Sequence, residues 1–316
     1  MTKIGIMLPS ELYAPRELVD LAVRAEDAGF DYITISDHYH PWTSQQGHSP
    51  FVWSVLGGIA AATDTIRVGT AVTCPTIRMH PAIVAQAAAT AAAMMPGRFF
   101  LGLGTGENLN EHVVGEPWPP PASRVAMLEE AIDIIRELWT GEEVSHDGDY
   151  YTVNRATLFT LPPEPPPIIV AAASPVSVRL AAANDGLITT ESDPEMIETF
   201  EESGGKGKPR FVQVGFCWQD DPEQALKTIL ESWPIAAMPW SIKTDIPTPA
   251  GFEAVAKLVR EEDIVEAMPL GPEPAPIIEL VREGVAAGFD HVTLQQIGPN
   301  VGPFIEFFAQ ELAPAL

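Results

Sequence analysis

A short segment near the N-terminus combines the residue types that proton transfer requires. Asp37 places a carboxylate beside the imidazole of His38, and the indole of Trp42 follows four residues after that histidine. An imidazole exchanges protons near neutral pH, and a flat ring beside it can shield a reacting group. The segment therefore predicts an acid/base site.

Two other interpretations of this segment stay open. Asp37 could cap the loop while His38 packs in a turn, or His38 and His40 could be the His-x-His ligands of a metal-dependent barrel hydrolase. That metal would need further ligands from later strands, yet no histidine occurs between His146 and His291. We therefore expect no metal.

A glycine-rich segment at 102–107 ends with Glu107, a second candidate acid/base residue. The segment begins like a dinucleotide-binding fingerprint, but Glu107 stands where the third glycine is required, and it follows the fourth expected strand rather than the first. We expect these glycines to let the backbone approach a ligand closely. Glu107 then either acts at the site or is merely solvated.

The segment 171–175 opens an expected helix with small residues, the hydroxyl of Ser174 and a proline in the first turn. Unpaired backbone N–H groups at a helix start can bind a phosphate. The alternative is that Ser174 serves only as the helix cap.

Short apolar runs alternate with helical patterns along the whole chain, and this order predicts the fold. Strands are expected at 3–8, 32–36, 66–72, 99–103, 168–172, 186–190, 211–218 and 291–296. Helices are expected at 16–29, 51–63, 81–95, 124–139, 175–183, 194–201, 222–233, 252–260 and 275–288. A β-hairpin is expected at 143–153.

Eight such units without a reversal signal favour a closed (β/α)8 TIM barrel over a doubly wound sheet. We expect one domain, 1–316, with insertion segments at the C-terminal strand ends. Catalytic groups in such barrels lie at that end, which is where His38 and Glu107 are expected.

Composition limits the function classes. The chain has 316 residues, with 43 acidic and 18 basic ones for a formal net charge of −25, so nucleic acid and anionic membranes are not expected partners. This acidity suits either a high-salt environment or an ordinary acidic enzyme. No apolar run approaches the roughly 20 residues of a membrane helix, and the N-terminus lacks a secretory pattern, so we expect a cytoplasmic protein. Two cysteines exclude a disulfide framework, so redox chemistry would need a cofactor.

Together these motifs resemble the deazaflavin-dependent branch of the bacterial-luciferase-like superfamily. The likeness is carried by Asp37-His38 with Trp42, by 69–72, by 104–110 and by 171–174, and it covers nearly the whole chain. Within that branch the sequence is most similar to glucose-6-phosphate dehydrogenases that use coenzyme F420.

The resemblance implies a site for coenzyme F420 and a role for each matching residue. His38 and Glu107 would be the acid/base pair, with His38 favoured as the base, while Trp42 would shield the reacting face and contact the substrate with Thr190. The bond between Ala71 and Val72 would be cis. The implied cofactor contacts are Asp37, Ala71, Val72, Cys74, Thr105, Gly106 and Asn110, with Ala173, Ser174, Val176 and Ser177 at its phosphate. A homodimer is the family expectation.

Departures from the family pattern bear on the substrate. Where relatives carry basic residues that bind a sugar phosphate, this chain has Asp193 and, by a rough alignment, Ala254 and Ala267. An acidic residue would repel a phosphate dianion. We therefore expect a small, non-phosphorylated alcohol, aldehyde or sugar-like substrate. The alternatives are a flavin-dependent monooxygenase, a sugar-phosphate dehydrogenase with a different phosphate site, and a non-catalytic cofactor-binding protein.

Overall fold

A closed barrel of eight parallel strands forms the centre of the protein, in a computed structural model that describes residues 2–316. In order around the barrel the strands are β1 (Lys3–Leu8), β2 (Tyr32–Ile35), β3 (Arg67–Thr70), β4 (Phe99–Leu103), β7 (Ile168–Ala171), β8 (Gly186–Thr189), β9 (Arg210–Phe216) and β10 (His291–Gln296). The sheet closes where β10 pairs with β1, with Lys3 opposite His291. The predicted (β/α)8 barrel is confirmed.

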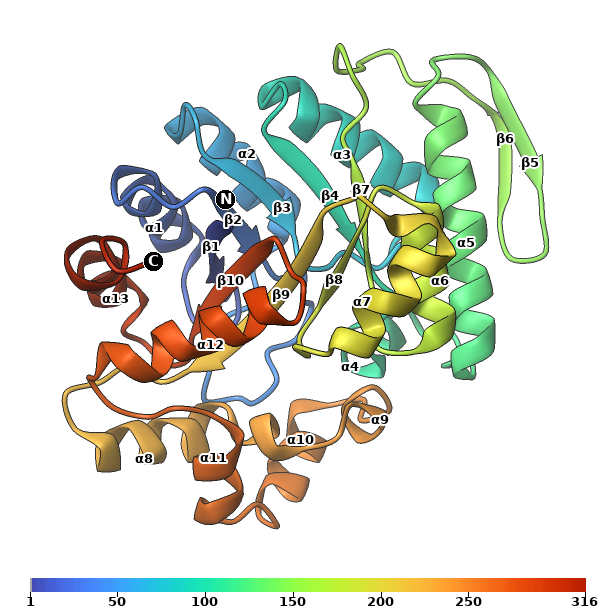
Figure 1. Cartoon of the computed structure of the whole chain (residues 1–316). Coiled ribbons are helices and arrows are strands. Elements are labelled where there is room, and N and C mark those ends of the chain that lie inside the picture. The colour runs from blue at the N-terminus through green and yellow to red at the C-terminus, as the bar shows by residue number, and fades with distance from the viewer. Residues whose placement is uncertain (1) are drawn as a thin grey trace.

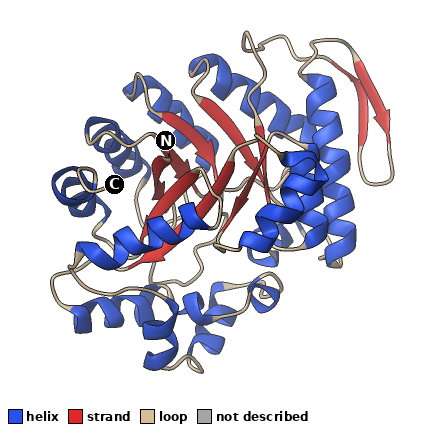
Figure 2. Cartoon of the chain, viewed as in Figure 1, coloured by secondary structure: helices blue, strands red, loops and turns tan. Residues whose placement is uncertain are grey.

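Helices surround the barrel and cover its outer face (Figure 1; Figure 2). They are α1 (Pro15–Asp27), α2 (Val52–Ala62), α3 (Pro81–Met94), α5 (Pro121–Leu138), α6 (Pro175–Ala183), α7 (Pro194–Phe200), α12 (Pro274–Ala286) and α13 (Val301–Phe307). Most begin with a proline, whose fixed φ and missing N–H suit the first helical position. In residues 2–316 no helix combines the length and apolar character that crossing a bilayer requires.

Large aromatic rings fill the inside of the barrel. The rings of Tyr32, Phe100 and Phe211 are buried and pack edge-on or stacked on one another. Gly5 and Gly69 lie beside them, and a Cβ at either position would overlap the ring of Tyr32 or Phe100. Small and large residues thus interlock in a solid core, so a ligand site must lie at a barrel end.

Two smaller features interrupt the alternation of strands and helices. The strands β5 (Val144–Asp147) and β6 (Thr152–Ala156) form an antiparallel hairpin outside the barrel, as predicted. The short helix α4 (Asn108–Glu111) directly follows Glu107, and the sequence pattern did not predict it.

A helical excursion connects β9 to α12 and lies beyond one end of the barrel (Figure 1). It contains α8 (Pro222–Ser232), α9 (Trp240–Lys243), α10 (Pro249–Ala256) and α11 (Glu261–Ala267). This is an insertion segment of the predicted kind. The helix predicted at 252–260 is present as α10, but it begins at Pro249 and ends at Ala256. The hydroxyl of Thr248 caps α10 by accepting a hydrogen bond from the N–H of Gly251, which explains the earlier start. Arg260 precedes α11, and its N–H donates to the carboxylate of Asp263.

Candidate active site

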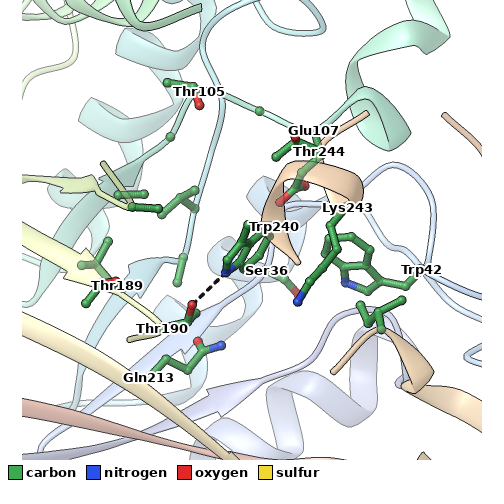
Figure 3. Close-up of a pocket in the computed structure, with 18 of the residues that line it drawn as sticks. Ser36, Trp42, Thr105, Glu107, Thr189, Thr190, Gln213, Trp240, Lys243 and Thr244 are labelled. Atoms are coloured by element: carbon green, nitrogen blue, oxygen red, sulfur yellow. Dashed lines mark hydrogen bonds between the residues drawn. The ribbon is translucent and has the colours of Figure 1, made fainter. Parts of the chain in front are cut away.

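The C-terminal ends of the barrel strands surround a cavity of about 620 Å³, a usual size for a ligand site. Figure 3 shows part of its wall. Nearly all the residues expected at the site line it: Asp37, His38, Trp42, Ala71, Val72, Cys74, Thr105, Gly106, Glu107, Asn110, Ala173, Ser174, Ser177 and Thr190. Val176 is different, because it is not among the lining residues and half of its surface, 51%, is exposed.

The imidazole of His38 lies between two carboxylates. Its Nε2 is 3.6 Å from Oε2 of Glu107, and its Nδ1 is 3.3 Å from Oε1 of Glu11. The backbone oxygen of His40 is also 3.2 Å from Nδ1. Because both neighbours of Nδ1 are acceptors, a hydrogen on Nδ1 satisfies them, and Nε2 of the neutral ring keeps a free lone pair. The ring can therefore accept a proton on the side that faces Glu107.

Glu11 is a site residue that the sequence analysis missed. Its side chain is buried, and Oε2 accepts a 2.7 Å hydrogen bond from the hydroxyl of Ser36, which in turn pairs with Ser10. This fixes the carboxylate against His38, where it can stabilise positive charge on the ring. Its place three residues after β1, at the catalytic end of the barrel, was the available signal.

Asn110 joins the histidine loop to Glu107. Its Oδ1 accepts from the backbone N–H groups of Tyr39 and His40, at 2.9 and 3.2 Å, and its Nδ2 donates to Oε2 of Glu107 at 3.1 Å. Glu107 itself is the residue that precedes α4. One amide thus positions both members of the predicted acid/base pair.

Asp37 is held by protein donors on both oxygens. Thr73 donates its hydroxyl to Oδ2 at 2.7 Å, and Arg78 donates from Nη2 to Oδ1 at 2.9 Å. The backbone N–H of Arg78 also donates to Glu111, whose pKa is raised by burial. Asp37 therefore anchors the loop that carries His38, whereas its contact with a cofactor stays a prediction.

Cys74 lines the cavity as an unreactive thiol. Burial raises its pKa well above the usual value, and the negative charges of Glu111 and Glu107 raise it further. The protonated thiol is a poor nucleophile. This geometry disfavours covalent catalysis by Cys74.

The chain turns away from β3 at the bond between Ala71 and Val72, which is cis, as the family resemblance implied. The strand predicted at 66–72 spans Arg67–Thr70. Behind this bond, a Cβ on Gly102 would overlap the carbonyl of Thr70, and one on Gly104 would overlap Val72. Both glycines therefore allow β4 to pack closely against the end of β3 and the chain that follows it. Gly104 also lines the cavity, so its expected role in the close approach of a ligand stays a prediction.

The N-terminus of α6 contributes backbone donors to the cavity wall. Ser174 caps the helix, and the hydroxyl of Ser177 accepts from the N–H groups of Ala173 and Ser174 at 3.1 and 3.0 Å. Ala173 and Ser174 are exposed to the cavity mouth, and the positive end of the helix dipole points there. The capping role of Ser174 is confirmed, and the helix start remains suited to an anion.

The excursion supplies the cation of the cavity. Lys243 is 9% exposed, and Figure 3 shows its side chain pointing inward beside Trp240. Burial lowers the pKa of Lys243 to about 8, against the opposing attraction of Glu107 and Glu191. The sequence analysis missed this residue because the excursion carries no strand by which to align it.

Three residues were expected to stand where relatives carry the basic residues that bind a substrate phosphate. Two of them lie outside the cavity wall, and the third is an alanine. Asp193 is not among the lining residues, and its carboxylate caps α7 by accepting from the N–H of Glu195 at 2.9 Å. Ala254 is exposed and also outside the wall, while Ala267 does line the cavity. The expectation that Asp193 repels a substrate is therefore wrong.

Over residues 2–316, no group of three or more His, Cys, Asp or Glu side chains is arranged to hold a metal ion. His40, the other half of the suspected metal pair, stacks on His112 with ring centroids 5.7 Å apart. Its Nδ1 lies 2.9 Å from the backbone oxygen of Leu109.

Comparison with known proteins agrees with this architecture. A family model described as luciferase-like monooxygenase matches residues 1–291. The chain belongs to the luciferase-like family. Relatives that resemble the chain over its whole length include an F420-dependent glucose-6-phosphate dehydrogenase of Intrasporangium calvum, 35% identical over 100% of this chain and 99% of the relative. The enzyme of that name from Mycobacterium tuberculosis is 34% identical over 99% and 98%.

A solved structure is also similar over nearly the whole chain. It is an F420-dependent secondary alcohol dehydrogenase in complex with an F420-acetone adduct, with a TM-score of 0.90 and 30% identity over 98% of this chain and 97% of that one. A coenzyme F420-dependent tetrahydromethanopterin reductase of Methanopyrus kandleri shares the fold, with a TM-score of 0.77 and 22% identity. The family predicted from the sequence is confirmed.

Proposed function

We propose that the protein is an F420-dependent dehydrogenase or reductase, which transfers a hydride between coenzyme F420 and a small alcohol or carbonyl compound without a phosphate group. The observation that carries this proposal is the pair of His38 and Glu107, held 3.6 Å apart in the strand-end cavity. Relatives named as F420-dependent dehydrogenases at 35% identity support the cofactor and the CH–OH chemistry. The TM-score of 0.90 to an F420-dependent secondary alcohol dehydrogenase supports them too.

The cavity wall fits a flat, phosphate-bearing cofactor. Ala71 and Val72 offer a small apolar surface on which a tricyclic ring can lie. The start of α6, where Ala173 and Ser174 line the cavity, offers the positive end of a helix dipole to a phosphate. When bound, F420 supplies the carbon centre that accepts or returns a hydride.

His38 is the proposed base for alcohol oxidation. Its Nε2 takes the hydroxyl proton as the C–H bond gives up its hydride, and the alcohol becomes a carbonyl compound. The positive ring that results lies 3.3 Å from the carboxylate of Glu11, which stabilises it. In the reverse direction the same nitrogen returns the proton to the carbonyl oxygen.

Glu107 and Trp42 complete the proposed machinery. Asn110 donates to Oε2 of Glu107, which leaves Oε1 to carry a proton. This carboxyl would supply the one proton that F420 takes up with the hydride, and the proton that His38 removes from the alcohol balances it. Trp42 is 4% exposed and its ring centroid is 5.0 Å from that of His38. It excludes water from one side of the imidazole.

The charges of the cavity support a substrate without phosphate. Among the described residues that line it, Lys243 is the one lysine or arginine, against five carboxylates: Glu11, Asp37, Glu107, Glu111 and Glu191. A buried phosphate dianion needs several cations or donors, and one lysine with a lowered pKa does not supply them. Neutral alcohols and carbonyl compounds avoid that cost.

Fluorescence titration of the protein with oxidised F420 and with flavin mononucleotide tests the cofactor. We expect F420 to bind more tightly by at least about tenfold, or 1.4 kcal/mol. Tighter binding of flavin mononucleotide by that factor would refute the proposal and favour a flavin monooxygenase.

A further inference from the structure

Trp240 lines the cavity and comes from the excursion rather than from a barrel strand. It begins the short helix α9, and its ring lies 6.5 Å from the ring of Trp42, edge to face. Trp42 in turn packs against His38. Trp42 thus connects the indole of Trp240 to the proposed base, and Figure 3 shows Trp240 and Trp42 in the same part of the cavity.

Two polar groups of the cavity are engaged by this one indole. Its Nε1 donates a 3.1 Å hydrogen bond to Oγ1 of Thr190, which follows β8 on the opposite wall (Figure 3). The ammonium nitrogen of Lys243 lies 4.5 Å from the centroid of the Trp240 ring. A cation over an indole face is held by the ring electrons.

Thr190 and Lys243 are the groups that a sugar hydroxyl or an anionic substrate group would seek in this part of the cavity. While Trp240 occupies them, such a substrate must displace the indole and break both contacts to reach these two groups. A small alcohol bound against Trp42 and His38 need not disturb either contact.

We propose that Trp240 determines substrate specificity: its indole shortens the cavity and engages both Thr190 and Lys243, and so excludes bulky, polyhydroxylated and phosphorylated substrates. This inference rests on the proposed function and names the substrate class, small alcohols and carbonyl compounds, that the site accepts. Removal of the indole should open a larger site that has one hydroxyl and one cation available.

The test compares wild type with Trp240→Ala and Trp240→Phe. With F420, kcat/KM is measured for 2-propanol, 2-butanol, 2-heptanol and glucose 6-phosphate. Trp240→Ala should raise the ratio of kcat/KM for 2-heptanol over 2-propanol by at least about tenfold, a shift that one extra or missing side-chain group commonly produces in a pocket. Trp240→Phe keeps most of the bulk but lacks the N–H, so it should keep the length limit. An equal change for all alcohols would overturn the proposal.

Equilibrium binding supplies a measurement that does not depend on turnover. Calorimetry of the F420-loaded protein should give at least about tenfold tighter binding of glucose 6-phosphate to Trp240→Ala than to wild type. Equal affinities would contradict the engagement of Thr190 and Lys243. Should Trp240→Ala fail to fold, Trp240→Leu removes the same N–H and ring.

The reactivity of Lys243 separates this inference from the proposed function. Reductive methylation, followed by mass spectrometry of the Lys243 peptide, can be measured on the protein without cofactor. Trp240→Ala should accelerate modification of Lys243, while that of Lys257, exposed on the same excursion, stays unchanged and serves as the control. Unchanged reactivity of Lys243 would refute the shielding. Failure of wild type to bind F420 would refute the proposed function alone.

Discussion

Replacement of His38 by alanine removes the proposed base and leaves most of the cavity in place. Nε2 is the one atom of the ring that has a free lone pair toward Glu107, since Nδ1 is committed to Glu11 and to the His40 carbonyl. A positioned general base typically contributes about 10²–10⁴-fold in rate. At about 1.4 kcal/mol for each factor of ten, the barrier to alcohol oxidation should rise by about 3–5 kcal/mol.

Cofactor affinity should change little in His38→Ala. Glu11 loses its imidazole partner but keeps the hydrogen bond from Ser36, and Asp37 keeps its contacts with Thr73 and Arg78. The loop is thus still anchored after the substitution. Stopped-flow measurement of the reduction of bound F420 by an alcohol gives the rate, and fluorescence titration gives the affinity.

His40→Ala is the matched control. His40 is two residues away and of the same type, but its ring stacks on His112 outside the cavity wall. Its reduction rate should stay within about threefold of wild type, as for most substitutions away from a site. A reduction rate for His38→Ala within that same range would remove this residue from the mechanism.

Three further predictions concern the neighbours of His38. Glu107→Gln should leave F420 affinity nearly unchanged and slow turnover by about 10²-fold or more; wild-type turnover in a steady-state assay would exclude Glu107 as an acid or base. Glu11→Gln keeps an acceptor near Nδ1 but removes the charge, so the rate of proton-coupled reduction should fall by roughly tenfold, or 1–2 kcal/mol, and an unchanged rate would contradict the charge stabilisation. Burial lowers the pKa of Lys243 to about 8, so its ammonium group should lose its proton between pH 7 and 9. NMR of ¹³C-labelled lysine should show one signal that titrates with a midpoint near pH 8, and this signal should be missing in Lys243→Met. A midpoint near the usual 10.4 would refute the burial argument.

The barrel could be predicted from the sequence because its signals are local. Apolar strands such as β4 at Phe99–Leu103 have the predicted bounds, and a proline marks the start of α6 at Pro175. Where the end of a strand or helix depends on the surrounding structure, its predicted bounds are wrong. The strand expected at 66–72 spans only Arg67–Thr70.

The site was predictable in part, for a related reason. His38 and Glu107 lie in the loops after β2 and β4, so the strand ends point to them, and Asn110 follows in the short helix α4. Lys243 and Trp240 reach the cavity from α9, a four-residue helix far along a connection without strands, and only tertiary packing brings them there. The role of Asp193 was misjudged because alignment alone does not distinguish a helix cap from a residue of the wall.

The most direct test of the central claim is a substrate panel with the wild-type protein and oxidised F420. Loss of the absorbance of oxidised F420 is followed with 2-propanol, longer secondary alcohols, free glucose and glucose 6-phosphate, in low and in molar salt. The account predicts reduction of F420 by at least one short neutral alcohol and negligible reduction by glucose 6-phosphate. Efficient turnover of glucose 6-phosphate, with a KM in the usual range of roughly 1 μM to 1 mM, would contradict it.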